Sequence, residues 1–437
     1  MSSFADLGVR PRTCETLLRL RITQPTPVQS AAIPLLQAGR DCLIQSPTGS
    51  GKTLAFLIPI VDRLRRHRAG EPRALIVTPT RELATQIGAV LGQLDPGLRH
   101  VLVFGGVGYG KQIGELRQAD VIVGCPGRLV DLSGSGAALL GAVEILVLDE
   151  ADEMLDAGFA RDVEAIIRRT HQRTTAARRQ TLLASATMPD WVASLAHRHL
   201  VDPARVAVAP EAESALEHGL LSVPREEKVM VLSQLLEQSE SSIVFHRTKH
   251  GVKKLARDLT ALGHSTSELQ GNLSQPARDR SIAAFRRRQT TVLVATNVAA
   301  RGIDVEDVGL VVNYELPDTA HWLTHRVGRT ARNGARGRAL TFLSEDESDK
   351  WRNLRRLGAP ELRFVDTARL LKSGTMTFLP GRPQELARIT PQPRPAPGSA
   401  NPHRAHRASL VVGVPARRRS RERSAGRRRR DLAAASP

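Results

Sequence analysis

The sequence predicts an α/β protein in which two parallel-sheet domains follow one another. Two observations support this fold class. Short, branched, uncharged runs alternate with helical stretches, and this alternation stops at an acid- and turn-rich bridge near residues 209–213 before it starts again. Such alternation favours a parallel sheet covered by helices on both faces. At 437 residues the chain is also too long for one ordinary core, so two or three domains are expected.

The first domain is expected at residues 1–208, with strands at 42–44, 75–77, 101–104, 121–123, 145–148 and 182–183. A short linker at 209–218 leads to the second domain at 219–365. Its strands are expected at 243–245, near 269, and at 292–294, 310–312 and 340–342. Residues 366–437 then form a tail of different composition.

This tail holds 16 Arg and Lys against 4 Asp and Glu, which is +12 of the net charge of +19. It is rich in Pro and Ala and lacks periodic apolar residues, so we expect it to be disordered. The arginine blocks 417–419 and 427–430 favour binding of a polyanion through its phosphates. A purely solubilising tail is the alternative.

Composition narrows the classes of protein that the chain can represent. Aromatic residues make up only 3%, which argues against a base-stacking sheet as the main nucleic-acid surface. Three widely spaced cysteines, Cys14, Cys42 and Cys125, indicate neither a zinc site nor a disulfide framework. The N-terminus lacks a signal-peptide core and no apolar run is long enough for a membrane helix, so we expect a soluble, cytoplasmic protein.

Residues 46–53, SPTGSGKT, have the setting of a phosphate-binding loop because they follow a strand and precede a helix. Glycines let backbone N–H groups approach phosphate oxygens, and the helix N-terminus favours negative charge. Lys52 would bind the β- and γ-phosphates of a nucleotide, and Thr53 would offer a hydroxyl to Mg²⁺. A simple Gly-rich turn is the alternative. The expected ATP-binding residues in this loop are Ser46, Thr48, Gly49, Ser50, Gly51, Lys52 and Thr53.

Acidic residues gather in VLDEADEMLDAGF, residues 147–159, directly after a buried-strand pattern. The carboxyl ends of parallel strands bind ligands in open α/β sheets. A phosphate loop needs a metal, and Asp149 fits the carboxylate that holds it from a neighbouring strand. Glu150 fits the base that orients and deprotonates the attacking water, and Asp152 is expected to point elsewhere. Alternatively, Asp149 or Asp152 only caps the following helix.

These motifs, together with others in a fixed order over nearly all of residues 4–343, resemble the DEAD-box family of ATP-dependent RNA helicases. Residues 149–152 spell the family name. The other matching segments are PTPVQ at 25–29 with Phe4 upstream (a Q motif within 4–29), PTRELA at 79–84, GG at 105–106, PGR at 126–128, SAT at 185–187, QPAR at 275–278, ATNVAARGID at 295–304 and HRVGRTAR at 325–332.

The resemblance implies two RecA-like domains that use ATP and Mg²⁺. In the family pattern Gln29 reads adenine and Asp304 lies near the ribose, and Gly302 is a further expected ATP-binding residue. Arg329 and Arg332 would be arginine fingers that complete the catalytic set of Lys52 and Glu150, although surface arginines are common in this chain. The residues expected to couple hydrolysis to unwinding are Asp152, Ser185, Thr187 and His325.

The resemblance also implies RNA as the partner, held across both domains mainly through phosphates and sugars, with little dependence on base sequence. Contacts to 2′-hydroxyl groups would favour RNA over DNA. The expected RNA-binding residues are Thr80, Arg81, Gly105, Gly106, Pro126, Gly127, Arg128, Thr248, Gly271, Gln275, Arg278 and Thr296.

Four positions depart from the family pattern. Ile22 stands where an aromatic residue usually lies beside adenine, and Cys125 replaces a Thr before the PGR segment. Asn297 replaces an Asp, and Ala331 replaces a Gly between Thr330 and Arg332. We expect activity to be retained, with RNA contacts or coupling retuned.

The function expected from the sequence is therefore an ATP-dependent RNA helicase that locally unwinds duplexes or remodels RNA–protein complexes. The compact body looks bacterial, and a monomer acting on ribosomal or messenger ribonucleoprotein is expected. An ATP-gated RNA clamp or annealing chaperone is the alternative from another functional class. A DNA-translocating motor fits less well because the motif set matches the RNA branch.

Overall fold

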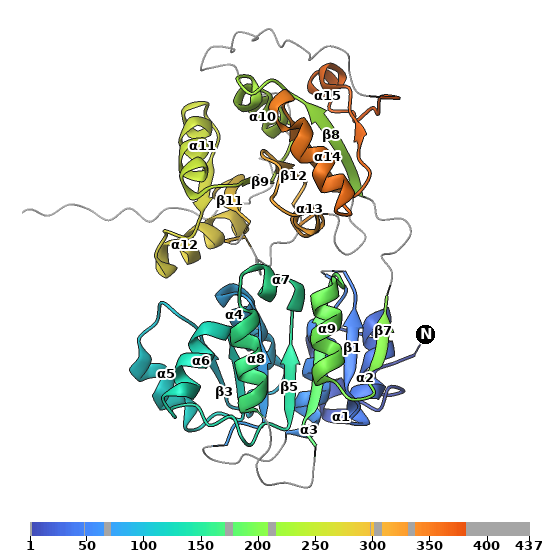
Figure 1. Cartoon of the computed structure of the whole chain (residues 1–437), viewed down its shortest axis with the longest axis vertical. Helices are drawn as coiled ribbons and strands as arrows, with labels where there is room; N and C mark the ends of the chain where they lie inside the picture. Colours follow the sequence, from blue (N-terminus) through green and yellow to red (C-terminus); the bar gives the residue numbers. More distant parts are fainter. Residues whose placement is uncertain are drawn as a thin grey trace, which may run out of the picture. The chain divides into compact units, whose positions relative to one another are not determined.

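The computed structural model describes residues 2–47, 49–64, 71–170, 178–208, 216–297, 299–300, 308–330 and 337–381. We call the described residues up to 208 the first lobe and those from 216 to 381 the second lobe. Figure 1 shows the first lobe in blue to green and the second in green to orange-red. Within the described residues, no helix has both the length and the apolar character needed to cross a membrane.

Each lobe contains one seven-stranded sheet in which all strand pairs are parallel. In spatial order the first sheet consists of β3 (His100–Val103), β4 (Val121–Gly124), β2 (Ala74–Val77), β5 (Ile145–Leu148), β6 (Gln180–Ser185), β1 (Cys42–Gln45) and β7 (Ala204–Ala207). The second consists of β10 (Thr266–Leu269), β11 (Val292–Thr296), β9 (Ser242–His246), β12 (Leu310–Asn313), β13 (Gly337–Leu343), β8 (Leu216–Ser222) and β14 (Arg363–Phe364). The two orders correspond strand for strand.

The helices of the first lobe cover both faces of its sheet because the strands are apolar on both faces. In β2, Ala74 and Ile76 pack in one core cluster, whereas Leu75 and Val77 pack in the other. The first cluster includes residues of α1 (Pro11–Arg19), α2 (Pro27–Gln37), α3 (Lys52–Arg63) and α4 (Arg81–Leu94). The second includes residues of α5 (Tyr109–Leu116), α6 (Pro126–Gly134), α7 (Ala151–Asp156), α8 (Ala160–Arg169) and α9 (Asp190–His199).

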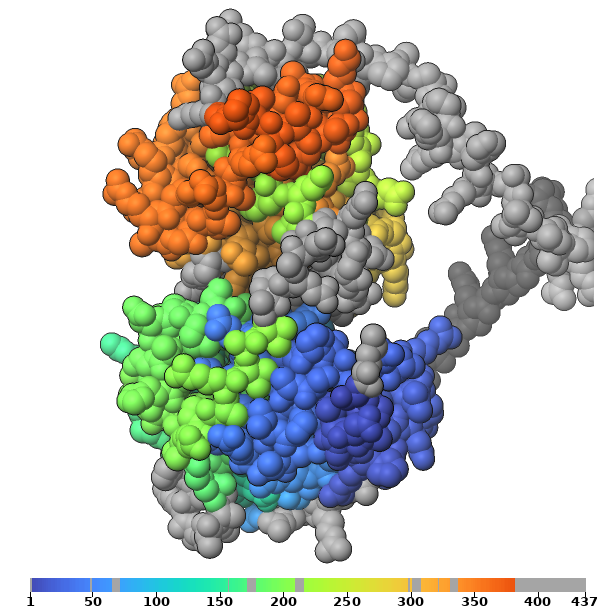
Figure 2. All heavy atoms as spheres, turned by 90° about the vertical axis from the view of Figure 1, so that its right-hand side faces the viewer, coloured from blue at the N-terminus to red at the C-terminus, as the bar shows by residue number. Residues whose placement is uncertain are grey.

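The N-terminal helices complete the first lobe beside β1 and β7. Helix α2 contacts both α3 and β7, and the dark blue N-terminal residues share one face of the lobe with green residues near 200 (Figure 2).

The second lobe adds α10 (Lys228–Glu237), α11 (Lys249–Ala261), α12 (Gln275–Arg286), α13 (Ala320–Val327), the 3₁₀ helix η1 (Glu345–Glu347), α14 (Ser348–Arg356) and α15 (Thr367–Ser373).

The structure confirms the fold class and every strand that the apolar runs predicted, and it adds β7, β8 and β14. Strand β7 is an edge strand in which exposed and buried residues alternate, so it forms no apolar run. Strand β8 begins at Leu216 and pairs with β13. The end of the expected linker at 216–218 is therefore part of the second sheet.

The expectation that disorder begins at Asp366 is wrong for residues 366–381. Asp366 caps α15 by accepting a hydrogen bond of 3.0 Å from the Arg369 N–H, and Leu370 is fully buried in the core of the second lobe. Val365 and Phe378 form an antiparallel bridge. A few buried side chains fix this segment. The prediction rested on the composition of residues 366–437 taken together, in which the Arg- and Pro-rich residues after 381 outweigh these few apolar ones. Residues 382–437 lie outside the described part.

Candidate functional site

The phosphate loop lies between β1 and α3, as its sequence predicted. Gly49 and Gly51 have φ values of +83° and +93°, a left-handed backbone that glycine adopts without strain. A Cβ at Gly51 would lie only 2.5 Å from Nε2 of Gln29. The Gln29 amide donates a hydrogen bond of 3.1 Å to the Gly51 carbonyl and accepts one of 3.0 Å from the Thr26 N–H. Gln29 thus joins α2 to the loop.

Lys52 is the first residue of α3, and its ammonium lies inside the loop. Its Nζ donates to the carbonyl oxygens of Ser46 and Pro47 at 2.5 and 2.6 Å, and the residue is 8% exposed. The backbone N–H of Ser46 donates to the Ser185 carbonyl at the end of β6. Loop, lysine and β6 are therefore joined before any ligand enters.

Asp149 follows β5 directly and is buried at 3% exposure. Strand β6 separates β5 from β1 in the sheet, so the expected neighbouring strand is in fact two positions from the phosphate loop. Burial raises the pKa of Asp149 to about 6, while Lys52 opposes the shift. The carboxylate also accepts a hydrogen bond of 3.0 Å from the Glu150 N–H.

Asp149 and Thr53 fit a Mg²⁺ ion that is bound together with a nucleotide. Asp152 and Glu153 add to the raised pKa of Asp149, so this buried acidic group would gain from a cation. Within the described residues, no group of three or more His, Cys, Asp or Glu could hold a metal by itself. Asp149 and the Thr53 hydroxyl would then leave most coordination positions to phosphate and water, which is the usual arrangement for Mg²⁺.

Glu150 has a left-handed backbone, with φ +50° and ψ 51°, and it is the N-cap residue of α7. The alternative that Asp149 or Asp152 caps this helix is therefore wrong, and Glu150 itself makes no side-chain cap bond. Burial, Glu153 and Asp149 raise the pKa of Glu150 well above its usual value, while Arg329 and His325 lower it. Its Oε2 has no hydrogen-bond partner among the described residues, which leaves an acceptor for water.

Asp152 connects α7 to the end of β6. Its Oδ2 accepts hydrogen bonds from the Thr187 N–H at 2.9 Å and from the Thr187 hydroxyl at 2.6 Å. Its own N–H donates to the Ser185 hydroxyl at 3.4 Å. The structure therefore brings together three of the four residues that were expected to couple hydrolysis to unwinding.

His325 on α13 is the fourth, and it reaches the first lobe. Its Nδ1 lies 2.6 Å from Oε1 of Glu153 and its Nε2 lies 3.3 Å from Oδ2 of Asp152. Burial would lower the pKa of His325, but hydrogen bonds to Asp152 and Glu153 raise it to about 10, so the ring is a cation at neutral pH. We call Asp152, Glu153, Ser185, Thr187 and His325 the coupling cluster. Sequence analysis missed Glu153, although it follows Asp152 directly.

Two arginines follow His325 in the second lobe, and both are buried. Arg329 is 6% exposed and lowers the pKa of Glu150, so its charge acts on the predicted base. Arg326, which sequence analysis missed, donates to Oδ1 of Asn297 at 2.8 Å and to Oδ1 of Asn313 at 3.1 Å. Burial lowers the pKa of Arg326 to about 9. The departure at Asn297 thus gives a buried guanidinium an amide instead of a carboxylate.

Residues of two predicted RNA-contact segments, one from each lobe, are joined. Arg81 at the start of α4 donates to the Gln275 side chain at 3.1 Å. Arg278 donates two hydrogen bonds to Oε1 of Glu82, at 2.6 and 2.8 Å. Thr80 caps α4 by accepting from the Leu83 N–H. Glu82 was not among the predicted residues, because an acid gives no signal of RNA binding.

Two of the predicted RNA-binding glycines of the first lobe, Gly105 and Gly106, lie against Arg81. A Cβ at Gly106 would lie 2.4 Å from Nη1 of Arg81, and one at Gly105 would lie 3.5 Å from its Nη2. Pro126 begins α6, and a Cβ at Gly127 would meet nothing within 4 Å. The backbone is therefore open at Gly127, as a close approach by a phosphate requires.

The remaining predicted RNA residues belong to the second lobe. Thr248 caps α11 by accepting from the Gly251 N–H at 3.0 Å. A Cβ at Gly271 would lie 3.0 Å from Cε of Lys249, and Thr296 is the last residue of β11. Among the described residues, no hydrogen bond joins Thr248, Gly271 or Thr296 to Arg81, Glu82, Gln275 or Arg278. Among the other predictions, Thr48, Gly302, Asp304, Ala331 and Arg332 lie outside the described residues.

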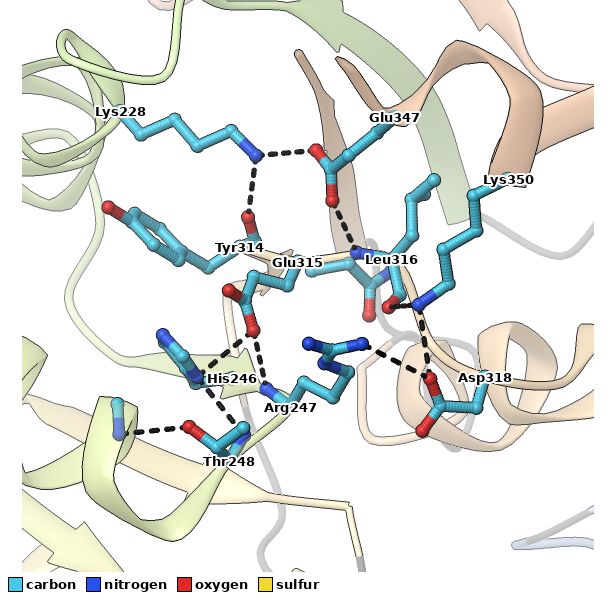
Figure 3. Close-up of polar contacts among 12 residues, drawn as sticks. Lys228, His246, Arg247, Thr248, Tyr314, Glu315, Leu316, Asp318, Glu347 and Lys350 are labelled. Atoms are coloured by element: carbon cyan, nitrogen blue, oxygen red, sulfur yellow. Dashed lines mark hydrogen bonds and ion pairs between the residues drawn. The ribbon is translucent and has the colours of Figure 1, made fainter.

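A polar pocket of about 560 Å³ lies at the carboxyl ends of β9, β12 and β13. Lys228, the first residue of α10, donates to Oε2 of Glu347 at 2.6 Å and to the Tyr314 carbonyl at 3.4 Å (Figure 3). His246 stacks on Tyr314, with ring centroids 5.7 Å apart, and its Nδ1 lies 3.1 Å from Oε2 of Glu315. In the strand order, β8 of the second sheet corresponds to β1 of the first. The segment after β8 lines this pocket, so the pocket is the counterpart of the phosphate loop after β1.

Two family models match the chain. The DEAD/DEAH box helicase model matches residues 26–195, and the helicase conserved C-terminal domain model matches residues 227–334. The RNA helicase CrhR of Synechocystis is 42% identical over 350 residues, which cover 78% of this chain and 70% of that protein. ATP-dependent RNA helicase RhlB of Xanthomonas axonopodis pv. citri is 41% identical over 357 residues, covering 78% and 62%.

A mitochondrial relative, DEAD-box ATP-dependent RNA helicase 9 of Arabidopsis thaliana, is 37% identical and covers 79% of this chain and 58% of its own length. The chain thus spans between 58% and 70% of these three curated relatives.

Solved structures give the same result. Dbp5 of S. cerevisiae bound to RNA and ADP BeF3 has a TM-score of 0.75 at 32% identity, covering 85% of this chain and 97% of that one. Mss116p bound to ssRNA and AMP-PNP has a TM-score of 0.74 at 26% identity, covering 85% and 81%. With two matching family models and more than 40% identity to bacterial relatives, the chain belongs to the DEAD/DEAH box helicase family.

Proposed function

We propose that this chain is an ATP-dependent RNA helicase, which hydrolyses ATP when RNA is bound and locally unwinds short duplexes or remodels RNA–protein complexes. One observation carries the proposal. In the coupling cluster, Asp152 links Thr187 of the first lobe to His325 of the second, and Glu153 also contacts His325. These two acids lie two and three residues after the predicted base Glu150. Relatives that are named RNA helicases and neighbours solved with RNA and nucleotide analogues support it.

In this proposal the first lobe binds ATP and provides the base. The open backbone of the phosphate loop and Lys52 hold the phosphates, while Gln29 is fixed beside the loop for contact with adenine. Asp149 and Thr53 would hold Mg²⁺, which neutralises charge on the phosphates. Glu150 orients a water molecule through its free carboxylate oxygen and accepts its proton.

The second lobe would supply the missing positive charge. Arg329, whose charge lowers the pKa of Glu150, would stabilise charge that develops on the terminal phosphate. The same role for Arg332 stays a prediction from the motif at 325–332. Because these arginines come from the other lobe, hydrolysis depends on how the lobes meet.

RNA would bind where the lobes share contacts, at Arg81 with Gln275 and Glu82 with Arg278. If RNA favours this arrangement of the lobes and the arrangement favours ATP binding, bound RNA raises the affinity for ATP. ATP must then raise the affinity for RNA by the same factor. The tail after residue 381 would add sequence-independent phosphate contacts. A bacterial cytoplasm and ribosomal or messenger ribonucleoprotein are the setting that we propose for this activity.

The direct test measures ATP turnover by the full chain with single-stranded RNA, with DNA of the same sequence and with neither. We expect RNA to stimulate turnover and DNA to do so far less. A short labelled RNA duplex measures strand displacement in parallel. Equal stimulation by DNA would contradict the RNA assignment. Stimulated turnover without displacement, under conditions where annealing is excluded, would instead favour an ATP-gated clamp.

Arg329→Ala tests the role of the second lobe. An arginine finger can change the rate by about 10³–10⁵, so we expect kcat to fall by at least about 10³ while the Kd for a non-hydrolysable ATP analogue changes little. A matched surface variant, Arg352→Ala on the exposed side of α14, should keep the parent kcat. An equal loss of ATP binding and turnover by Arg329→Ala would make the arginine a ground-state contact.

Removal of residues 382–437 tests the tail. We expect weaker RNA binding and a smaller slope of log Kd against log salt, because about 0.7 counterions are released for each phosphate contact on single strands. Turnover without RNA should persist. An unchanged slope would make the tail a solubilising segment.

A further inference from the structure

We propose that Tyr109 and Arg128 form a stacking platform that binds one RNA base on the first lobe. The proposal rests on the RNA binding proposed above and names a subsite within it. The residues assigned to RNA so far act on phosphates and sugars. An aromatic ring would add a contact to a base, which is a different chemistry.

The two side chains are already stacked. The guanidinium carbon of Arg128 lies 3.9 Å from the centre of the Tyr109 ring, within the range of a cation–π contact. Arg128 also donates to the Val107 carbonyl at 3.1 Å. The Tyr109 hydroxyl lies 3.3 Å from Oδ2 of Asp131 on α6. Both planar groups are therefore held in a fixed orientation between the starts of α5 and α6.

Tyr109 remains open to solvent despite these contacts, with 49% of the residue exposed. One face of the ring lies under Arg128, so the exposed surface belongs to its other face and its edges. The chain has only two tyrosines and 3% aromatic residues, and the other tyrosine, Tyr314, stacks on His246 and packs at a tilt against Phe342. An exposed ring is thus a rare feature of this sequence, and no packing requirement accounts for it.

The surroundings leave room for a nucleotide. A Cβ added at Gly108, Gly110 or Gly127 would meet no atom within 4 Å, so the backbone on either side of Tyr109 and before Arg128 is not crowded by other atoms. Gly105 and Gly106, which lie against Arg81, come just before this segment. A strand of RNA held by its phosphates along these glycines and arginines would bring a base to Tyr109.

The chemistry favours a base over a protein side chain. An arginine stacked on an aromatic ring presents two planar surfaces, and every nucleobase has a flat face that can continue such a stack. Backbone without side chains offers few anchors to a protein partner, whereas it allows close approach of a sugar–phosphate chain. The platform would bind any base, because stacking does not read hydrogen-bonding edges.

The test compares Tyr109→Ala with Tyr109→Phe, and with Leu139→Ala as a control at another exposed apolar residue of the first lobe, 62% exposed. The Kd for single-stranded RNA is measured with a non-hydrolysable ATP analogue. Stacking of one base corresponds to roughly a tenfold change in affinity, so we expect Tyr109→Ala to bind about tenfold more weakly. Tyr109→Phe and Leu139→Ala should bind within about twofold of the parent.

An oligonucleotide of the same length with abasic sites separates a base contact from a structural effect. The parent and Tyr109→Ala should bind this abasic strand equally, because neither can stack on it. Arg128→Ala should also reduce the salt slope by about 0.7, the value for one phosphate contact on a single strand, whereas Tyr109→Ala should leave it unchanged. A tenfold loss on the abasic strand as well would overturn the platform and make Tyr109 a structural residue.

The outcomes also separate this inference from the proposed function. If RNA stimulates ATP turnover of the parent but Tyr109→Ala and Leu139→Ala bind RNA equally, the platform is wrong and the helicase proposal stands. If the parent shows no RNA stimulation and binds no RNA, the proposed function itself fails.

Discussion

The phosphate loop of the first lobe and the polar pocket of the second occupy equivalent places in two sheets of the same strand order. Each has a lysine as the first residue of the helix that follows the equivalent strand, Lys52 in α3 and Lys228 in α10. Each also has a glutamate two residues after the equivalent strand, Glu150 after β5 and Glu315 after β12. The same positions nevertheless have different chemistry.

The difference begins in the loop before the helix. Residues 46–51 contain Gly49 and Gly51 with positive φ, and their N–H groups can turn inward. Residues 223–227, VPREE, contain no glycine. Lys228 in turn is neutralised by Glu347, which lies 2.6 Å away. Conserving a fold position therefore does not conserve a binding site, because the loop backbone and the partner of the lysine decide whether phosphate can enter.

Glu150→Gln compared with Glu315→Gln gives the largest expected difference between the two places. Removing the proposed base should lower RNA-stimulated kcat by at least about 10² to 10⁴, the usual contribution of general base catalysis. Glu315 accepts a hydrogen bond of 3.0 Å from the Arg247 N–H, which an amide oxygen can replace. We therefore expect Glu315→Gln to keep the parent kcat. Steady-state turnover of both variants checks this, and near-normal turnover by Glu150→Gln would remove it as the base.

Lys52→Ala compared with Lys228→Ala separates binding from stability. Lys52→Ala should weaken ATP binding and turnover with little effect on unfolding. Lys228→Ala leaves Glu347 without its ion-pair partner in a largely buried site, with side chains 5% and 17% exposed. Breaking such a pair costs about 3–5 kcal/mol, so the free energy of unfolding should fall without loss of ATP affinity in the folded protein.

Denaturant titration measures the free energy of unfolding of both variants. The Kd for ATP is measured at a temperature where both variants are folded. Lys228→Met combined with Glu347→Leu should recover most of the lost stability, because replacing both charges removes the unpaired group. Loss of ATP affinity in Lys228→Ala comparable to that in Lys52→Ala would contradict the distinction.

Asn297→Asp gives the smallest expected effect, and it concerns how the second lobe holds its buried arginine. A carboxylate would replace the amide that now accepts from Arg326 at 2.8 Å. Hydrogen bonds to charged groups are worth about 1 kcal/mol more than neutral ones, so we expect the free energy of unfolding to rise by about that amount. A denaturant midpoint below that of the parent would contradict this expectation and mean that burying the new carboxylate costs more than its bond to Arg326 returns.

Sequence patterns predicted the interior of both sheets well. The buried strands β2 and β5 are short, uncharged runs made mostly of branched residues, and such runs are typical of parallel strands covered on both faces. The phosphate loop could be found for the same reason, since its glycines and lysine lie within a few residues of each other between a strand and a helix. Edge elements such as β7 and β14 carry no such run, and α15 is too short to show a helical period.

What the sequence by itself determined about this protein is the local chemistry: two α/β units, a phosphate loop, and an acidic segment after a buried strand. Only the tertiary structure decided which of these groups meet. His325 contacts Glu153 from 172 residues away, and Arg278 contacts Glu82 from 196 residues away. Local patterns report the conformation of a segment and the burial of its faces, whereas such pairs depend on how the folded sheets bring distant loops together.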